Sequence, residues 1–373
     1  MNYLFSQTTS LIYKNIFKPV FFLMDPEFVH ERLTASGELM GKCWCTRKLF
    51  RGLYRFDDAA LQQELHSVNF KTPVGLAAGF DYQAQLTQIL PSLGFGFGTV
   101  GTITNLAYAG NPPPRLGRLP KSKSLMVYKG FKNNGAKSVA QKLVKLKFSY
   151  PAGVSIGRSN NKGLITQKDS VKDIIKAFET FLSAKVNDAY YELNISCPNL
   201  FGDVSFYPPK NLKDLLTEVD KLKISQPIFI KMPIEKTDAE TLGMLDIIVK
   251  HQIAGVIFGN LQKNRKDPAL DPQEVARFTY GNFSGKPTFK RSNELIKLAY
   301  KRFGKKLTVI GCGGIFNAED AYTKIKLGAS LVQLITGMIF EGPALIGQIN
   351  YGLVQLLKQD GFTHISQAVG VEA

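Results

Sequence analysis

The stretch of sequence that decides the fold is YYELNISCPN, which runs from Tyr190 to Asn199. Its first half has the alternating apolar pattern of a short strand, and its second half gathers amides, a hydroxyl and a thiol around Pro198. Parallel α/β proteins hold their ligands with polar groups that gather where strands end. Asn194 and Asn199 can both donate and accept hydrogen bonds, and Cys197 can accept a proton as a thiolate. We therefore predict a strand followed by a functional loop, with a buried free cysteine in an ordinary connection as the alternative.

Strand patterns and helical patterns alternate along the rest of the chain. The strands are expected near Val74–Leu76, Phe97–Gly101, Gly153–Gly157, Tyr190–Ile195, Ile228–Lys231, Gly255–Gly259, Thr308–Gly311 and Leu331–Leu334. The helical patterns between them include residues 133–146, 171–186, 237–251 and 317–327. Eight such units predict an α/β fold, a (β/α)8 TIM barrel. A doubly wound sheet is disfavoured because no GxGxxG motif follows a strand.

The composition is that of a soluble globular enzyme, and 373 residues can bury a large core. The four cysteines and four histidines show no paired metal-ligand spacing, so we predict no metal site and no disulfide framework. Reduced thiols favour a cytosol-facing protein. Two expected connections, residues 197–210 and 260–290, are longer than usual, and long loops on such a scaffold tend to carry function.

The net charge of +17 is unevenly distributed, because the stretch from Arg115 to Lys147 holds two arginines and eight lysines but no acidic residue. Nucleic acid, anionic lipid or a plain solvated face would each account for such a stretch. No nucleic-acid-binding motif or array of stacking aromatics accompanies the lysines, so we predict no nucleic-acid partner.

The N-terminus has apolar residues at helical spacing, from Leu11 to Leu23. Lys14 and Lys18 interrupt the run, so it does not have the roughly 20 apolar residues of a spanning helix. An amphipathic helix in the membrane surface fits the pattern, and a helix packed on the main domain fits it equally well. A second helix is expected over residues 27–42, followed by a basic, aromatic linker to about Asp57.

Two glycine clusters follow the last two expected strands. The first is IGCGG at residues 310–314, and the second is ITG at residues 335–337. Barrels of this type build phosphate sites from backbone N–H groups at these strand ends, so we expect a phosphorylated cofactor or a sugar phosphate. Lys231 ends the fifth strand, where burial favours an anionic partner, and Asn260 follows the sixth.

Taken together, these residues resemble the dihydroorotate dehydrogenase family, and the layout is similar to its membrane-associated, quinone-using class 2 members. The likeness covers nearly the whole chain, although no single motif would be specific. It is carried by Asp25-Pro26-Glu27 with His30, by residues 75–81, by residues 110–112 with Pro114-Arg115, and by residues 130–131, 194–199, 284–287, 311–314 and 331–333.

The resemblance implies an FMN-dependent enzyme that oxidises dihydroorotate to orotate in pyrimidine (UMP) biosynthesis and passes the electrons to a membrane quinone. Residues 1–45 would be an amphipathic extension for membrane and quinone access, and residues 46–373 the FMN-binding barrel. The enzyme would lie peripherally on the cytoplasmic side of the membrane, which is the inner membrane in a bacterium. Implied site residues are the base Cys197, the FMN ligands Ala78, Gly79, Thr102, Ser155, Asn194, Lys231, Gly259, Gly285, Gly313, Gly314, Thr336 and Gly337, the substrate ligands Tyr82, Phe131, Asn194, Asn199 and Asn260, and the quinone-site residues His30 and Arg115.

The chain also departs from the family pattern, mostly on the substrate side. Cys197 is similar to the cysteine base of the soluble class 1 enzymes, where quinone-using members usually have serine. Tyr82 replaces the substrate-binding lysine, and Lys129 or Lys132 could supply a substitute charge. The remaining departures are Val127 and Ser155 in place of asparagines, Leu261 in place of a polar residue and Ile335 in place of an aromatic. Three alternatives stay open: a related FMN oxidoreductase with another small substrate, a non-redox sugar-phosphate-binding barrel, and a homologue that binds a ligand without turnover.

Overall fold

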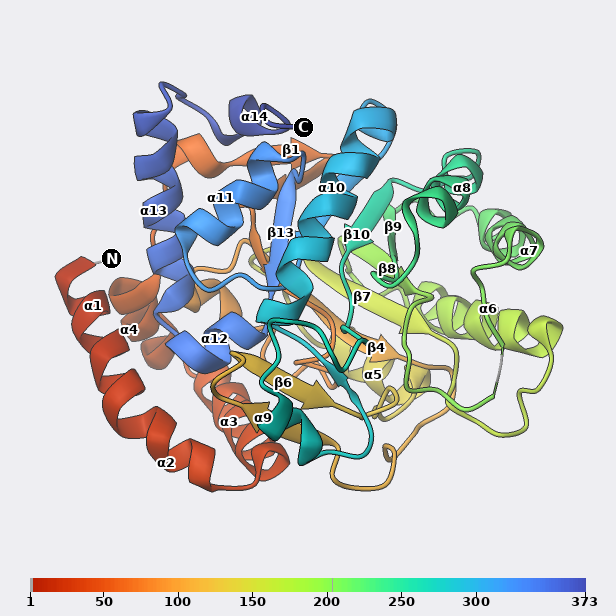
Figure 1. Ribbon diagram of the computed structural model, residues 1–373, viewed down its shortest axis with the longest axis horizontal. Coiled ribbons are helices and arrows are strands. Elements are labelled where there is room, and N and C mark those ends of the chain that lie inside the picture. The colour runs from red at the N-terminus through yellow and green to blue at the C-terminus, as the bar shows by residue number, and fades with distance from the viewer. Residues whose placement is uncertain (1–2, 203) are drawn as a thin grey trace.

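The computed structural model describes residues 3–202 and 204–373, and its centre is a closed barrel of eight parallel strands (Figure 1). The strand order around the barrel is β10-β12-β13-β3-β4-β7-β8-β9. The bounds are β3 (Val74–Leu76), β4 (Phe97–Ile103), β7 (Ala152–Gly157), β8 (Tyr190–Asn194), β9 (Ile228–Lys231), β10 (Gly255–Phe258), β12 (Thr308–Cys312) and β13 (Leu331–Leu334). The predicted (β/α)8 barrel is therefore confirmed, and the strand ends differ from the expected ones by at most two residues.

Helices surround the barrel and bury one apolar face each against it (Figure 1). In α6, for example, Ile174, Phe178 and Phe181 are fully buried, which is the i, i+4, i+7 spacing of one helical face. The outer helices are α5 (Ala136–Leu143), α6 (Gln167–Ala184), α7 (Pro209–Lys221), α8 (Asp238–Ile248), α10 (Phe289–Phe303), α11 (Ala318–Lys326) and α13 (Leu345–Gln359). Shorter helices are α9 (Pro272–Ala276), α12 (Thr336–Glu341) and α14 (Ile365–Ala368).

The amino-terminal end of the barrel is plugged by aromatic side chains. The rings of Phe97 and Tyr190 point inward, and glycines on neighbouring strands make room for them. A Cβ at Gly153 would lie 2.2 Å from the Tyr190 ring, so only glycine fits there. The hairpin of β1 (Gln63–Leu65) and β2 (Val68–Phe70) covers this end, and Phe70 packs on Phe97 at a ring distance of 5.3 Å. A ligand must therefore enter at the other end, where the strands finish.

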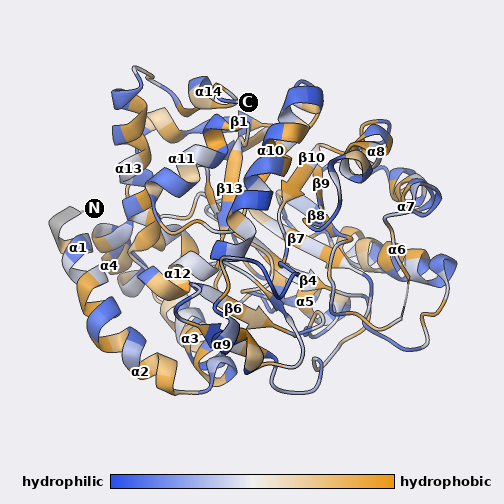
Figure 2. Ribbon diagram, in the orientation of Figure 1, coloured by the Kyte–Doolittle hydropathy of each residue, from blue (hydrophilic) through white to orange (hydrophobic). Residues whose placement is uncertain are grey.

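The N-terminal extension is a set of helices that lies along one side of the barrel (Figure 1). It consists of α1 (Tyr3–Ile12), a π-helical turn (Tyr13–Phe17), α2 (Lys18–Leu23), α3 (Pro26–Lys42) and α4 (Trp44–Tyr54). The Tyr13 hydroxyl donates to the backbone oxygen of Ile339 at 2.7 Å, which fixes the extension to α12. Figure 2 shows apolar and polar residues interspersed along α1 and α2. No helix among the described residues is long and apolar enough to cross a membrane.

Residues 44–54 form helix α4, so the expectation of a linker up to Asp57 is wrong over this segment. The basic residues gave the segment a loop-like composition, but Phe50 packs against the main core and supplies the tertiary contact that stabilises a short helix. The helix begins at Trp44, one residue before the expected end of the extension.

A second, three-stranded sheet, which was not predicted from the sequence, lies over the open end of the barrel. It consists of β5 (Leu116–Leu119), β6 (Ser124–Val127) and β11 (Asn282–Phe283), all antiparallel. The strands come from two long connections, one of which is the segment 260–290 expected to carry function. This sheet determines where the residues after Val127 enter the site.

Candidate active site

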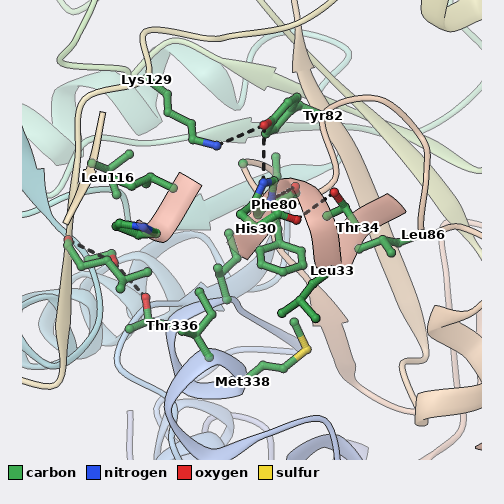
Figure 3. Close-up of a pocket in the computed structure, with 18 of the residues that line it drawn as sticks. His30, Leu33, Thr34, Phe80, Tyr82, Leu86, Leu116, Lys129, Thr336 and Met338 are labelled. Atoms are coloured by element: carbon green, nitrogen blue, oxygen red, sulfur yellow. Dashed lines mark hydrogen bonds between the residues drawn. The ribbon is translucent and has the colours of Figure 1, made fainter. Parts of the chain in front are cut away.

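A cavity of about 470 Å³ lies where the barrel strands end and continues beneath the N-terminal helices (Figure 3). Its volume is in the range of small-molecule and cofactor sites. Most of the predicted site residues line it. They are Cys197, the cofactor candidates Ala78, Gly79, Thr102, Asn194, Lys231 and Thr336, the substrate candidates Tyr82, Phe131, Asn199 and Asn260, and the quinone-site candidate His30.

The remaining cofactor candidates lie behind this lining. The Ser155 hydroxyl is 3.0 Å from that of Thr102, so it supports a lining residue. Gly313 has φ +100°, and a Cβ there would lie 2.3 Å from the Thr288 hydroxyl. These contacts show that the loops above the barrel pack too closely for a side chain. Gly259, Gly285, Gly314 and Gly337 are equally confined, each with a neighbouring atom between 1.9 and 2.6 Å from the position of a Cβ.

Arg115 does not line the cavity. Its Nε donates to Glu27 at 2.8 Å, and Nη1 donates to the Ala109 backbone oxygen at 2.9 Å. Arg118, from the same strand segment, does line the cavity and lies over the Phe22 ring with its guanidinium carbon 4.9 Å from the ring centre. Sequence reasoning missed Arg118, because which arginine a short strand turns inward depends on its pairing.

The asparagine side chains are held in place by neighbouring hydroxyls and a backbone oxygen. Asn194 Nδ2 donates to the Thr102 hydroxyl at 2.9 Å, and its Oδ1 accepts from Ser196 at 3.2 Å. Asn260 Nδ2 donates to the Ser196 hydroxyl at 2.6 Å. Asn199 Nδ2 donates to the Val127 backbone oxygen at 3.1 Å. The three amides, two from the end of β8 and its loop and one after β10, are thus pre-oriented to bind a polar ring.

Cys197 lies among these amides and lines the same cavity. Burial raises the pKa of its thiol to about 12, and the positive charges of Lys263, Arg158 and Lys231 offset only part of this rise. The group is therefore a thiol at neutral pH in the protein alone.

The charged residues that line the cavity are all positive. Arg118, Lys129, Lys132 and Lys231 line it, and none of the aspartates or glutamates in the described residues does. Lys231 is 5% exposed, and its ammonium has no hydrogen bond or ion pair with any group that the structure describes. A buried cation without a partner is costly, so this site is built for anionic ligands.

Tyr82 connects two of the lining groups (Figure 3). Its ring stacks on His30 with centroids 5.4 Å apart, and its hydroxyl is 3.5 Å from His30 Nδ1. His30 Nε2 is 2.8 Å from the Phe80 backbone oxygen, which can only accept, so Nε2 carries the proton. On the other side, Lys129 Nζ donates to the Tyr82 oxygen at 3.2 Å. Burial and the charge of Lys129 lower the pKa of His30 to about 3, so the imidazole is neutral.

The fold and the cavity define a barrel protein with a ligand site at the carboxyl ends of its strands, the place where such barrels carry their active sites. Residues 60–357 match the family described as dihydroorotate dehydrogenase, and the chain belongs to this family.

The likeness to known proteins covers nearly the whole chain. It is 34% identical to a protein of Trichodesmium erythraeum named dihydroorotate dehydrogenase (quinone), over 96% of this chain and 98% of that protein. A protein of Sulfurovum with the same name is 35% identical, over 95% of this chain and 97% of the relative. The crystal structure of the ligand-free enzyme of Eimeria tenella has a TM-score of 0.80 at 27% identity, covering 93% of this chain and 99% of that one.

Proposed function

We propose that the protein oxidises dihydroorotate to orotate and passes the electrons to a quinone, with FMN as its cofactor. One observation carries this proposal: a single cavity joins an amide-lined, positively charged end at the barrel strands to an apolar end under the N-terminal helices. A polar anionic substrate and an apolar acceptor would thus bind the same protein at different ends.

At the polar end, the chain's own groups bind the substrate ring and move one proton. Asn194, Asn199 and Asn260 would hydrogen-bond the polar edge of the ring, since their amides are already oriented by neighbouring groups. Cys197 Sγ would take the proton from the substrate carbon as a general base. Because its pKa is raised, the thiolate is scarce at neutral pH, and the rate should increase as the pH increases.

The residues present fit FMN. Lys231 offers an unpaired, buried ammonium to an anionic part of the cofactor, and Thr336 offers a hydroxyl at the start of α12. The Thr336 hydroxyl is 2.8 Å from that of Ser284, and this contact holds its oxygen in place. When bound, FMN would accept a hydride from the substrate and pass the electrons on to the quinone.

At the apolar end, the lining comes from the extension and includes Phe21, Val29, Leu33 and Met40. This surface would admit an apolar quinone beside the neutral His30. Arg118, rather than Arg115, would be the cation that faces it.

The outer face of the extension would dock on an anionic membrane surface. Apolar side chains on it face solvent, among them Leu11, Ile16, Val20 and Leu23, and Leu23 is 91% exposed. Such side chains together with basic residues are typical of a helix that lies in the membrane interface. We propose a peripheral position on the cytoplasmic side of the membrane, with no nucleic-acid partner.

The visible absorption spectrum of the purified protein tests the proposal. The protein should be yellow, release FMN on denaturation, and show a shifted flavin band when orotate is added. A correctly folded protein that takes up no FMN would contradict the oxidoreductase function and favour a non-redox, sugar-phosphate-binding barrel.

A further inference from the structure

Two lysines flank the turn at Gly130-Phe131, and their surroundings differ. Lys132 Nζ is 2.8 Å from Glu27 and 2.7 Å from Glu31, so its charge is balanced by two carboxylates of α3. Lys129 forms no ion pair with any carboxylate that the structure describes.

Lys129 is buried in addition to lacking a carboxylate partner among the described residues. The residue is 8% exposed, and its only protein partner in the described chain is Tyr82, whose ring centre is 4.5 Å from Nζ. A phenol and its ring stabilise an ammonium far less than a carboxylate does. Burial accordingly lowers the pKa of Lys129 to about 8, while Glu27 acts in the opposite direction. An anionic ligand in the cavity would supply the missing charge.

The position of Lys129 along the chain places it beside the substrate end of the cavity. Val127 precedes it by two residues, and the Val127 backbone oxygen accepts the amide hydrogen of Asn199. Phe131 follows by two residues. All three residues line the cavity, and the turn at Gly130-Phe131, where both residues have φ +65°, holds this segment against it.

We propose that Lys129 binds the carboxylate of the substrate and that Tyr82 positions its ammonium; this rests on the proposed function, which makes a carboxylate the substrate's anionic group. The Tyr82 ring is stacked on His30, and its hydroxyl is 3.5 Å from Nδ1, the ring nitrogen that can accept because Nε2 donates to Phe80. The lone pairs of the phenol are therefore left for Lys129. The cationic partner of the carboxylate has moved from the loop after β3, where the family pattern has lysine, to the segment after β6.

Comparing the binding of orotate and uracil distinguishes carboxylate binding by Lys129 from a general effect on the site. Uracil has the same type of ring without the carboxylate. Calorimetric titration of the FMN-loaded Lys129→Met variant should show orotate affinity lowered tenfold or more, with uracil affinity unchanged. Lys132→Met is the matched control, since it removes the same side chain from the same turn. Because the Lys132 charge is already balanced, orotate affinity should change less than twofold.

A second measurement uses the wild-type protein and does not depend on the folding of a variant. Orotate affinity should fall about tenfold per pH unit above pH 8, as Lys129 loses its proton. The charged or titratable groups facing Lys129 are Glu27, His30 and Glu31 of α3, Tyr82 of the loop after β3, and the nearby Arg115 and Lys132. The pKa of Glu27 is lowered and that of His30 is about 3, so neither group changes charge in this range.

Three results would overturn the inference. If the wild type and Lys129→Met bind orotate equally well, Lys129 does not bind the carboxylate, and the proposed function stays intact. Equal losses of orotate and uracil affinity would show that Lys129 supports the site as a whole. Wild type that does not bind orotate at all would overturn both the inference and the proposed function.

Discussion

The two ends of the cavity are built in different ways. At the barrel end, strand termini hold polar groups such as Asn194 and Asn260 in a network of hydrogen bonds. At the other end, helices of the extension present apolar side chains such as Phe21 and Leu33 and few hydrogen bonds. Rigid strand ends suit precise recognition of a polar ring, and an apolar helical surface suits a ligand that arrives from a membrane. The difference indicates that changes at one end should leave binding at the other intact.

The largest effect is expected from Cys197→Ala at the barrel end. Loss of the general base should slow bleaching of the flavin by dihydroorotate by roughly a hundredfold or more, as is typical for removal of such a group. FMN content and quinone affinity should be unchanged. Stopped-flow absorbance measures the rate, and Cys197→Ser should retain part of it. Bleaching of Cys197→Ala at the wild-type rate would show that another group takes the proton.

The pH dependence gives the next largest effect. A base must be deprotonated to act, and the pKa of Cys197 is raised to about 12. The bleaching rate at saturating dihydroorotate should therefore increase about tenfold per pH unit from pH 7 to 9, without a plateau near the ordinary thiol pKa of roughly 8.5. A rate independent of pH over this range would contradict the assignment of Cys197.

A negative charge introduced on the outer face of the extension should weaken membrane binding and leave ligand binding unchanged. Leu23→Glu places a carboxylate at a side chain that is 91% exposed, so folding should be unaffected. Binding to anionic liposomes, measured by co-sedimentation, should weaken about tenfold, and orotate binding should not change. Ile165→Glu is the matched control, because Ile165 is 78% exposed on the connection between β7 and α6. Equal losses in both variants would show that the extension is not the docking face.

The smallest effect is expected from Tyr82→Phe. The ring and its stacking on His30 remain, but the hydrogen bond at 3.2 Å to Lys129 is lost. Since a net hydrogen bond contributes about 1 kcal/mol, orotate affinity should fall roughly fivefold, less than in Lys129→Met. A loss larger than that of Lys129→Met would mean that Tyr82 itself contacts the ligand.

The barrel strands could be predicted because each is a short apolar run with a clear end. Lys231 before Met232-Pro233 marks the end of β9, and the ladder of parallel strands confirms the position. The sheet of β5, β6 and β11 could not be predicted in the same way, since its strands are two to four residues long and β11 pairs with β6 from a distant segment.

The directions of individual side chains could not be predicted from the sequence either. It offered Lys129 and Lys132 as equivalent sources of charge, and Glu27 and Glu31, about a hundred residues earlier in the chain, are what distinguish them. The same holds for Arg115, which pairs with Glu27, and Arg118, which faces the cavity. Partners contributed by a distant helix decide which cation remains available to a ligand.

The central claim is that one cavity serves a polar electron donor and an apolar electron acceptor. Anaerobic reduction and reoxidation of the FMN-loaded protein tests this claim most directly. Dihydroorotate should bleach the flavin absorbance, and a quinone should restore it, while fumarate and NAD should not. Failure of dihydroorotate to bleach the flavin would contradict the substrate. Reoxidation by fumarate or NAD in place of a quinone would contradict the role of the extension.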